Sequence, residues 1–327
     1  MSAIPLSAQT GRSMKRRIFL LADITVTIGK HTFQNPVFAA SGTFGYGLEN
    51  PDLVDISAFG AIVTKSITRQ PREGNPPPRI VETPSGMINS IGLSNIGVDK
   101  YVSDMVPKYA DIGCPVIMNI AGSSEDEYCE IVEIIESVNS NIIGYEVNIS
   151  CPNVKHGGIE FGVNAELTES LTSKIRKRTG KLVIMKLSPN VTDIRSIAKA
   201  AEAGGADALS AINTVYGMSI NPHTKKSEIY TTYGGLSGPA IKPVGLACVH
   251  KVSLAVDVPV IGIGGITSGK DAVEYILAGA SAIQVGTANY RDPATGISIL
   301  DDLKRYLAEQ NIATVAEMIG MVETYES

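Results

Sequence analysis

One cysteine stands among polar residues, in a setting that suits a reactive thiol. Cys151 follows an apolar run and shares its loop with Asn148, Ser150 and Asn153. An unperturbed thiol has a pKa of about 8.5, so a partly ionised Cys151 could act as a base. Most unpaired cysteines are small buried residues instead, but the polar neighbours favour a catalytic role here. The Gly-rich segment 155–162 predicts a mobile lid over this thiol.

Two lysines lie in apolar runs, where a charge without a partner is costly. Lys65 lies near the end of the run 61–66, and Lys186 lies within the run 182–189. Burying either side chain alone would cost several kcal/mol, so each needs a partner. A cation beside the pyrimidine end of an isoalloxazine ring would stabilise an anionic reduced flavin, and another could bind a substrate carboxylate. A Schiff-base lysine is the alternative that these residues leave open.

Two Gly-rich segments and four asparagines indicate what else this site could bind. GIGGI at 262–266 and VGT at 285–287 suit a phosphate site, because glycine lets backbone N–H groups approach an anion. Asparagine offers both a donor and an acceptor, which suits the alternating edge of a pyrimidine-dione. The asparagines in question are Asn89, Asn148, Asn153 and Asn213. Their number favours an uncharged, hydrogen-bonding ring over a sugar phosphate as the second ligand.

Composition and charge argue against several other functions. The 327 residues carry a formal net charge of −5, which does not suit nucleic acid as the main partner. The cysteines form no C-x-x-C pair, so no metal site is expected, and Cys114, Cys129 and Cys248 are expected to pack in the core. No apolar stretch reaches the length of about 20 residues that a membrane span needs. We therefore expect a cytoplasmic protein without a membrane segment, with residues 1–22 as a disordered lead.

Eight short apolar runs alternate with longer amphipathic stretches. The runs are nearly continuous in apolar residues, as expected of parallel strands buried on both faces. They are 36–42, 61–66, 115–122, 144–151, 182–189, 208–214, 259–266 and 282–288. Strand and helix alternating eight times predicts an α/β fold, a single (β/α)₈ TIM barrel that forms one domain at 23–327. A doubly wound open sheet is the alternative, but eight regular units ending near the C-terminus favour closure.

Three segments are additions that a minimal barrel does not need. Residues 23–36 predict an N-terminal hairpin across the lower end, while 67–98 and 215–238 predict long irregular loops over the active site. In this fold the loops after the strands build the site, and polar or glycine residues gather there. These residues are Ser41, Lys65, Ser66, Asn119, Asn148, Cys151, Lys186, Asn213, Thr214, Gly264, Gly265, Gly286 and Thr287.

The chain resembles the class 1 dihydroorotate dehydrogenases, and most closely the 1B group. The motifs that carry the resemblance are NPVFAASGTFGYG, VTKSIT, PREGNPPPR, NSIGLSN, NISCPN, KLSPN, INT, GGLSGPAIKP, GIGGI and VGT. The resemblance implies one FMN per chain and the oxidation of dihydroorotate to orotate in pyrimidine (UMP) synthesis. The chain departs from the family at Ser94, at Ile96 and within 219–233, in loops expected to cover the site.

The resemblance also implies roles for individual residues. The family's base position falls on Cys151. The expected substrate contacts are Lys65, Asn89, Ser90, Ile91, Gly92, Leu93, Asn148, Asn153, Asn213 and Thr214. The FMN contacts fall on Ser41, Lys65, Ser66, Asn119, Asn148, Lys186, Ile212, Gly238, Gly264, Gly265, Gly286 and Thr287.

In the 1B group, electrons pass to NAD⁺ through a second subunit that holds FAD and a [2Fe–2S] cluster. This chain lacks a cysteine pattern for such a cluster, which fits that division. We expect a homodimer, or a heterotetramer with the second subunit. The residues leave three other functions open: a related flavin barrel acting on dihydrouracil or dihydrothymine, a non-redox lyase or isomerase, and a silent flavin-binding subunit. Lys65 favours a carboxylated substrate, and Cys151 argues against a silent subunit.

Overall fold

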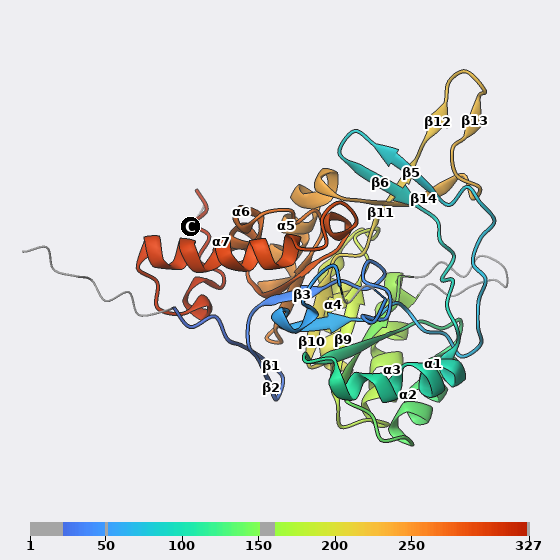
Figure 1. The fold of residues 1–327 in the computed structure, drawn as a ribbon, viewed down its shortest axis with the longest axis horizontal. Helices are drawn as coiled ribbons and strands as arrows, with labels where there is room; N and C mark the ends of the chain where they lie inside the picture. Colours follow the sequence, from blue (N-terminus) through green and yellow to red (C-terminus); the bar gives the residue numbers. More distant parts are fainter. Residues whose placement is uncertain (1–21, 50–51, 151–160, 326–327) are drawn as a thin grey trace, which may run out of the picture.

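The fold is built around a closed barrel of eight parallel strands. The computed structural model describes residues 22–49, 52–150 and 161–325, and the barrel has the strand order β10-β15-β16-β3-β4-β7-β8-β9 (Figure 1). The strands are β3 (Val37–Ala39), β4 (Ala61–Val63), β7 (Val116–Ile120), β8 (Ile142–Asn148), β9 (Leu182–Leu187), β10 (Ala208–Ala211), β15 (Val260–Ile263) and β16 (Ala280–Val285). Each overlaps one of the eight predicted runs. The predicted barrel is therefore confirmed, and the alternative prediction of an open sheet is wrong.

Helices surround the barrel and connect its strands. They are α1 (Val98–Asp104), α2 (Glu125–Glu136), α3 (Ala165–Arg176), α4 (Ile194–Ala203), α5 (Lys242–Ser253), α6 (Gly269–Leu277) and α7 (Thr295–Gln310). The first crossover departs from the predicted alternation, because its described residues form only a short 3₁₀ helix, η1 (Ile56–Ala58). Gly42, Gly45 and Gly47 there take positive φ angles, which a right-handed helix does not accommodate. Within the described ranges, no helix is long and apolar enough to cross a membrane.

A short hairpin closes the lower end of the barrel, as the sequence predicted. Strand β1 (Val26–Ile28) pairs antiparallel with β2 (His31–Phe33). Val26 and Phe33 are buried in one apolar cluster with residues near the starts of the barrel strands, such as Leu182. The hairpin therefore covers the end of the barrel opposite to the strand C-termini.

Two segments that the sequence predicted as irregular loops pair into a second sheet, here called the rim sheet. Its order is β11-β14-β6-β5, formed by β5 (Ile80–Thr83), β6 (Gly86–Asn89), β11 (Val215–Met218) and β14 (Tyr233–Ser237). Asn89 pairs with Gly235 across the two segments. A small hairpin of β12 (Ile220–Asn221) and β13 (Lys226–Ser227) projects beyond the rim sheet (Figure 1). The two long segments are therefore ordered walls rather than irregular loops.

Candidate active site

The C-terminal ends of the barrel strands and the rim sheet enclose a cavity of about 1070 Å³. Most residues that the sequence singled out line this cavity. They are Ser41, Lys65, Ser66, Asn89, Ser90, Ile91, Gly92, Leu93, Asn148, Lys186, Ile212, Asn213, Thr214, Gly238, Gly264, Gly265, Gly286 and Thr287. Asn119 is fully buried and does not line the cavity. Cys151 and Asn153 lie outside the described residues, as does most of the predicted lid.

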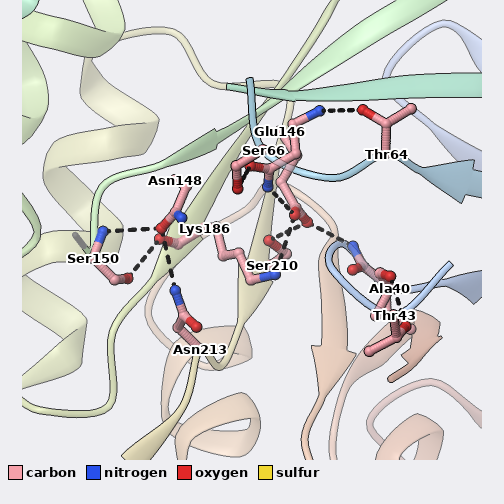
Figure 2. Close-up of polar contacts among 12 residues, drawn as sticks. Ala40, Thr43, Thr64, Ser66, Glu146, Asn148, Ser150, Lys186, Ser210 and Asn213 are labelled. Carbon is pink, nitrogen blue, oxygen red and sulfur yellow. Dashed lines mark hydrogen bonds and ion pairs between the residues drawn. The ribbon is translucent and has the colours of Figure 1, made fainter. Parts of the chain in front are cut away.

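Beneath the cavity lies a buried carboxylate that the sequence analysis missed. Glu146 of β8 is fully buried and accepts hydrogen bonds from side chains on four other strands (Figure 2). The donors are Asn119 Nδ2 at 2.7 Å, Lys186 Nζ at 3.2 Å, Ser210 Oγ at 2.9 Å and Gln284 Nε2 at 2.7 Å. We call these five residues the floor network. A buried charge is tolerated when it is paired and hydrogen-bonded, so the network fixes the position of the Lys186 ammonium group.

Asn119 belongs to this floor and not to the cavity surface. Its Oδ1 accepts a hydrogen bond of 2.5 Å from Ser66 Oγ, while its Nδ2 donates to Glu146. Ser66 itself lines the cavity. Asn119 therefore connects a cavity-lining hydroxyl to the buried carboxylate, and its direct contact with FMN stays a prediction.

Lys65 has a different environment from Lys186. It lines the cavity and is partly buried, and its ammonium group makes no hydrogen bond or ion pair with any residue in the described ranges. Burial lowers the pKa of Lys65 below its usual value, although the Glu49 carboxylate acts in the opposite direction. A cation without a protein partner at the wall of a cavity suits an anionic group of a ligand.

Three asparagine amides line the cavity, where a planar ring could meet them. Asn148 Oδ1 accepts from Asn213 Nδ2 at 3.2 Å and from the Ser150 N–H at 3.2 Å (Figure 2). Asn89 Nδ2 donates to the Gly235 carbonyl at 3.3 Å. These bonds leave Asn148 Nδ2 and Asn89 Oδ1 without a partner in the described chain. One donor and one acceptor thus remain for the edge of a ligand.

The ends of β15 and β16 present backbone N–H groups to the cavity. Gly264, Gly265, Gly286 and Thr287 line it, and their N–H groups donate to no residue of the described part of the chain. A Cβ at Gly286 would lie 3.5 Å from the Cβ of Ala40, so this glycine leaves space that a side chain would fill. Backbone donors at the ends of the last two barrel strands suit a phosphate group.

Comparison with known proteins identifies the family. The family model for dihydroorotate dehydrogenase matches residues 23–307. The chain belongs to the dihydroorotate dehydrogenase family. It is 49% identical over 303 residues to the dihydroorotate dehydrogenase B (NAD(+)) catalytic subunit of Bacteroides thetaiotaomicron, which covers 93% of this chain and 100% of that protein. It is 50% identical over 301 residues to the same subunit of Geobacter sulfurreducens, which covers 92% of this chain and 98% of that protein.

A solved structure supports the same family. The crystal structure of DHODH in complex with ferulenol from Eimeria tenella superposes with a TM-score of 0.77 at 27% sequence identity. The match covers 91% of this chain and 88% of that chain. Dihydroorotate dehydrogenases of this family are flavoproteins, and family membership implies an FMN-binding catalytic subunit.

The residues of the cavity fit FMN. The N–H groups near Gly265 and Gly286, which have no acceptor in the described chain, match a phosphate. The Lys186 ammonium group, paired with Glu146, offers a fixed cation for the polar edge of a flavin ring. The space left at Gly286 would be filled by any side chain. Lys65 remains as a second cation without a partner in the described ranges.

Proposed function

We propose that this chain uses FMN to oxidise dihydroorotate to orotate, as a step of pyrimidine (UMP) synthesis. The observation that carries the proposal is that the backbone N–H groups share one cavity with Lys65, which has no partner among the described residues. The first feature suits the phosphate of FMN, and the second suits the carboxylate that distinguishes dihydroorotate from neutral dihydropyrimidines. The family and the names of the relatives support the same activity.

Substrate binding is proposed to combine one ionic contact with several amide contacts. The Lys65 ammonium group would bind the carboxylate. The negative charge of the carboxylate would favour the protonated lysine and so oppose the lowering of its pKa by burial. Asn148 Nδ2 would donate a hydrogen bond to a ring C=O group, and Asn89 Oδ1 would accept one from a ring N–H group. The remaining proposed substrate contacts are Ser90, Ile91, Gly92, Leu93, Asn153, Asn213 and Thr214.

Oxidation removes a proton from C5 and a hydride from C6 of dihydroorotate. The hydride, with its two electrons, would pass to bound FMN. We propose Cys151 as the base that accepts the C5 proton, on the sequence evidence, since it lies outside the described residues. The described cysteines do not line the cavity, and burial raises the pKa of each, that of Cys114 to about 12. These three thiols are therefore unsuited to this step.

Lys186 is proposed to act as a cation and not as a covalent catalyst. Its Nζ is bonded to Glu146 within the buried floor network, and its side chain is 8% exposed. An ammonium group held in this way is not free to attack a carbonyl, and the proposed reaction supplies no aldehyde or ketone. Lys186 would instead favour negative charge on the side of the cavity that it faces.

The acceptor of the electrons is proposed to lie in a second subunit. The relatives are named as catalytic subunits of an enzyme that uses NAD(+), which implies a separate partner for those proteins. We propose that this chain, as a homodimer, joins a subunit holding FAD and a [2Fe–2S] cluster, and that the assembly works in the cytoplasm.

The proposal is tested by comparing dihydroorotate with dihydrouracil, which lacks the carboxylate. Turnover of both is measured with one artificial electron acceptor. We expect kcat/KM for dihydroorotate to exceed that for dihydrouracil by at least about tenfold, the loss expected when a hydrogen bond to a charged group is missing. Equal or faster turnover of dihydrouracil would contradict the assigned substrate.

A further inference from the structure

A buried tyrosine behind the phosphate side of the cavity has a hydroxyl aimed at the backbone there. Tyr275 lies on α6 and is fully buried, and it does not line the cavity. Its Oη donates a hydrogen bond of 2.7 Å to the carbonyl of Gly264, and the carbonyl of Ile263 lies 3.4 Å away. Burial raises the pKa of Tyr275, so the phenol keeps its proton and remains a donor.

Two glycines make room for this hydroxyl and its ring. A Cβ at Gly245, on α5, would lie 2.0 Å from Tyr275 Oη. A Cβ at Gly262, on β15, would lie 2.5 Å from Tyr275 Cδ1. Helices α5 and α6 lie side by side (Figure 1), and α5 packs against β15 and β16 while α6 packs against β16. A side chain at either glycine would therefore push the tyrosine out of its position.

The hydrogen bond determines which way one peptide group points. The peptide between Gly264 and Gly265 is trans and planar, so its C=O and N–H point in opposite directions. Gly264 and Gly265 have φ angles of 128° and 67°, which only glycine adopts readily, so this backbone is intrinsically free to reorient. With the Gly264 carbonyl held by Tyr275 behind the cavity wall, the Gly265 N–H is directed to the cavity side.

We propose that Tyr275 is a positioning residue for the phosphate of FMN. Its hydroxyl fixes the Gly264–Gly265 peptide so that an N–H donor, and not a carbonyl oxygen, faces the anion. The inference rests on the proposed function, because it requires the phosphate to lie at the ends of β15 and β16. Tyr275 acts through the backbone and does not contact the flavin.

The test compares two flavins that differ in the phosphate alone. Apoprotein of the full chain is titrated with FMN and with riboflavin, and dissociation constants are measured by the quenching of flavin fluorescence. For Tyr275→Phe we expect the dissociation constant of FMN to rise about tenfold, as for a weakened hydrogen bond to a charged group, with that of riboflavin changed less than about twofold. The ring stays in place, so a role in packing alone would not separate the two flavins.

A second variant and a control make the result decisive. Gly245→Ala places a methyl group at the position of the Tyr275 hydroxyl. It should weaken the binding of FMN, and not that of riboflavin, in the same way. Tyr145→Phe is the control, since Tyr145 is equally buried and donates to Glu136 Oε1 away from the cavity lining. It should leave the binding of both flavins unchanged.

Each remaining outcome decides against the positioning role alone or against both proposals. Unchanged FMN binding by Tyr275→Phe, or equal weakening of both flavins, would overturn the positioning role while leaving the proposed function intact. A wild-type apoprotein that binds neither flavin would overturn the proposed function itself, and the positioning role with it.

Discussion

The two lysines of the cavity have the same side chain but different electrostatic environments. Lys186 lies on the floor, where Glu146 compensates its charge and three further side chains complete the hydrogen bonds of that carboxylate. Lys65 lies at the wall, and the described residues offer its ammonium group no partner. The Glu146 carboxylate therefore has its hydrogen-bond partners without a ligand, whereas the Lys65 ammonium group has none in the described chain.

This difference suggests a division of work within the cavity. A buried ion pair whose carboxylate accepts three further hydrogen bonds is preorganised, which suits a cofactor that stays bound through every turnover. An uncompensated cation gains most from a ligand that brings its own negative charge, which suits a substrate that comes and goes. Lys186 should therefore matter for stability and for the flavin, and Lys65 for the affinity of the substrate.

The largest effect is expected at the proposed base, whose role neither lysine can take over. Cys151→Ala should lower the rate of flavin reduction by dihydroorotate about 10²–10⁴-fold, because the proton acceptor is lost. FMN content and orotate affinity should stay as in the wild type. Stopped-flow absorbance measures the rate, and reduction at the wild-type rate would show Cys151 to be a structural thiol.

The second prediction concerns the floor. Lys186→Met leaves Glu146 as a buried carboxylate without its cation, which should lower the free energy of unfolding by about 3–5 kcal/mol. Adding Glu146→Gln in the same chain removes the uncompensated charge and should recover part of that loss. Chemical denaturation of both variants measures the effect. If Lys186→Met is as stable as the wild type, the ion pair does not hold the floor together.

The third prediction is the counterpart at the wall. Lys65→Met removes a cation that has no partner in the described chain, so the free energy of unfolding should not fall. The dissociation constant of orotate should rise about 10–100-fold, because a hydrogen bond between charged groups is lost. Isothermal titration of orotate and denaturation of the same sample separate the two effects. A stability loss matching that of Lys186→Met would erase the contrast between floor and wall.

The smallest effect is expected in the pH dependence of orotate binding. Burial holds the pKa of Lys65 below its usual value, and a bound carboxylate favours the charged form and raises that pKa again. The affinity for orotate should therefore be constant near neutral pH. It should fall as the pH rises through the lowered pKa of Lys65, because the free lysine then loses its proton. Lys65→Met carries no such group, so the difference between its profile and that of the wild type isolates Lys65. Parallel profiles would exclude it.

The contrast also explains which parts could be predicted from the sequence. Barrel strands are buried on both faces, so each appears as an apolar run that needs no knowledge of its neighbours. The polar ends of those runs could be placed in one site because parallel strands of a barrel end at the same face. Lys65 and Lys186 were found in this way.

Interactions between distant segments could not be predicted in the same way. The rim sheet joins β6 to β14 through pairs such as Asn89 with Gly235, and neither short segment shows a strand pattern by itself. Glu146 did carry a signal, since an acid within the apolar run 144–151 must find a cation. Its partner, Lys186, lies on the neighbouring strand β9, but only the closed barrel shows that Ser210 and Gln284 complete the carboxylate's bonds.

The most direct test of the central claim is an anaerobic titration of the purified chain with dihydroorotate, followed by absorbance and by the orotate formed. We predict a yellow protein with one FMN per chain, whose flavin absorbance is bleached as one equivalent of orotate appears for each FMN reduced. A colourless protein without extractable flavin, or a flavin that dihydroorotate leaves oxidised, would contradict the account.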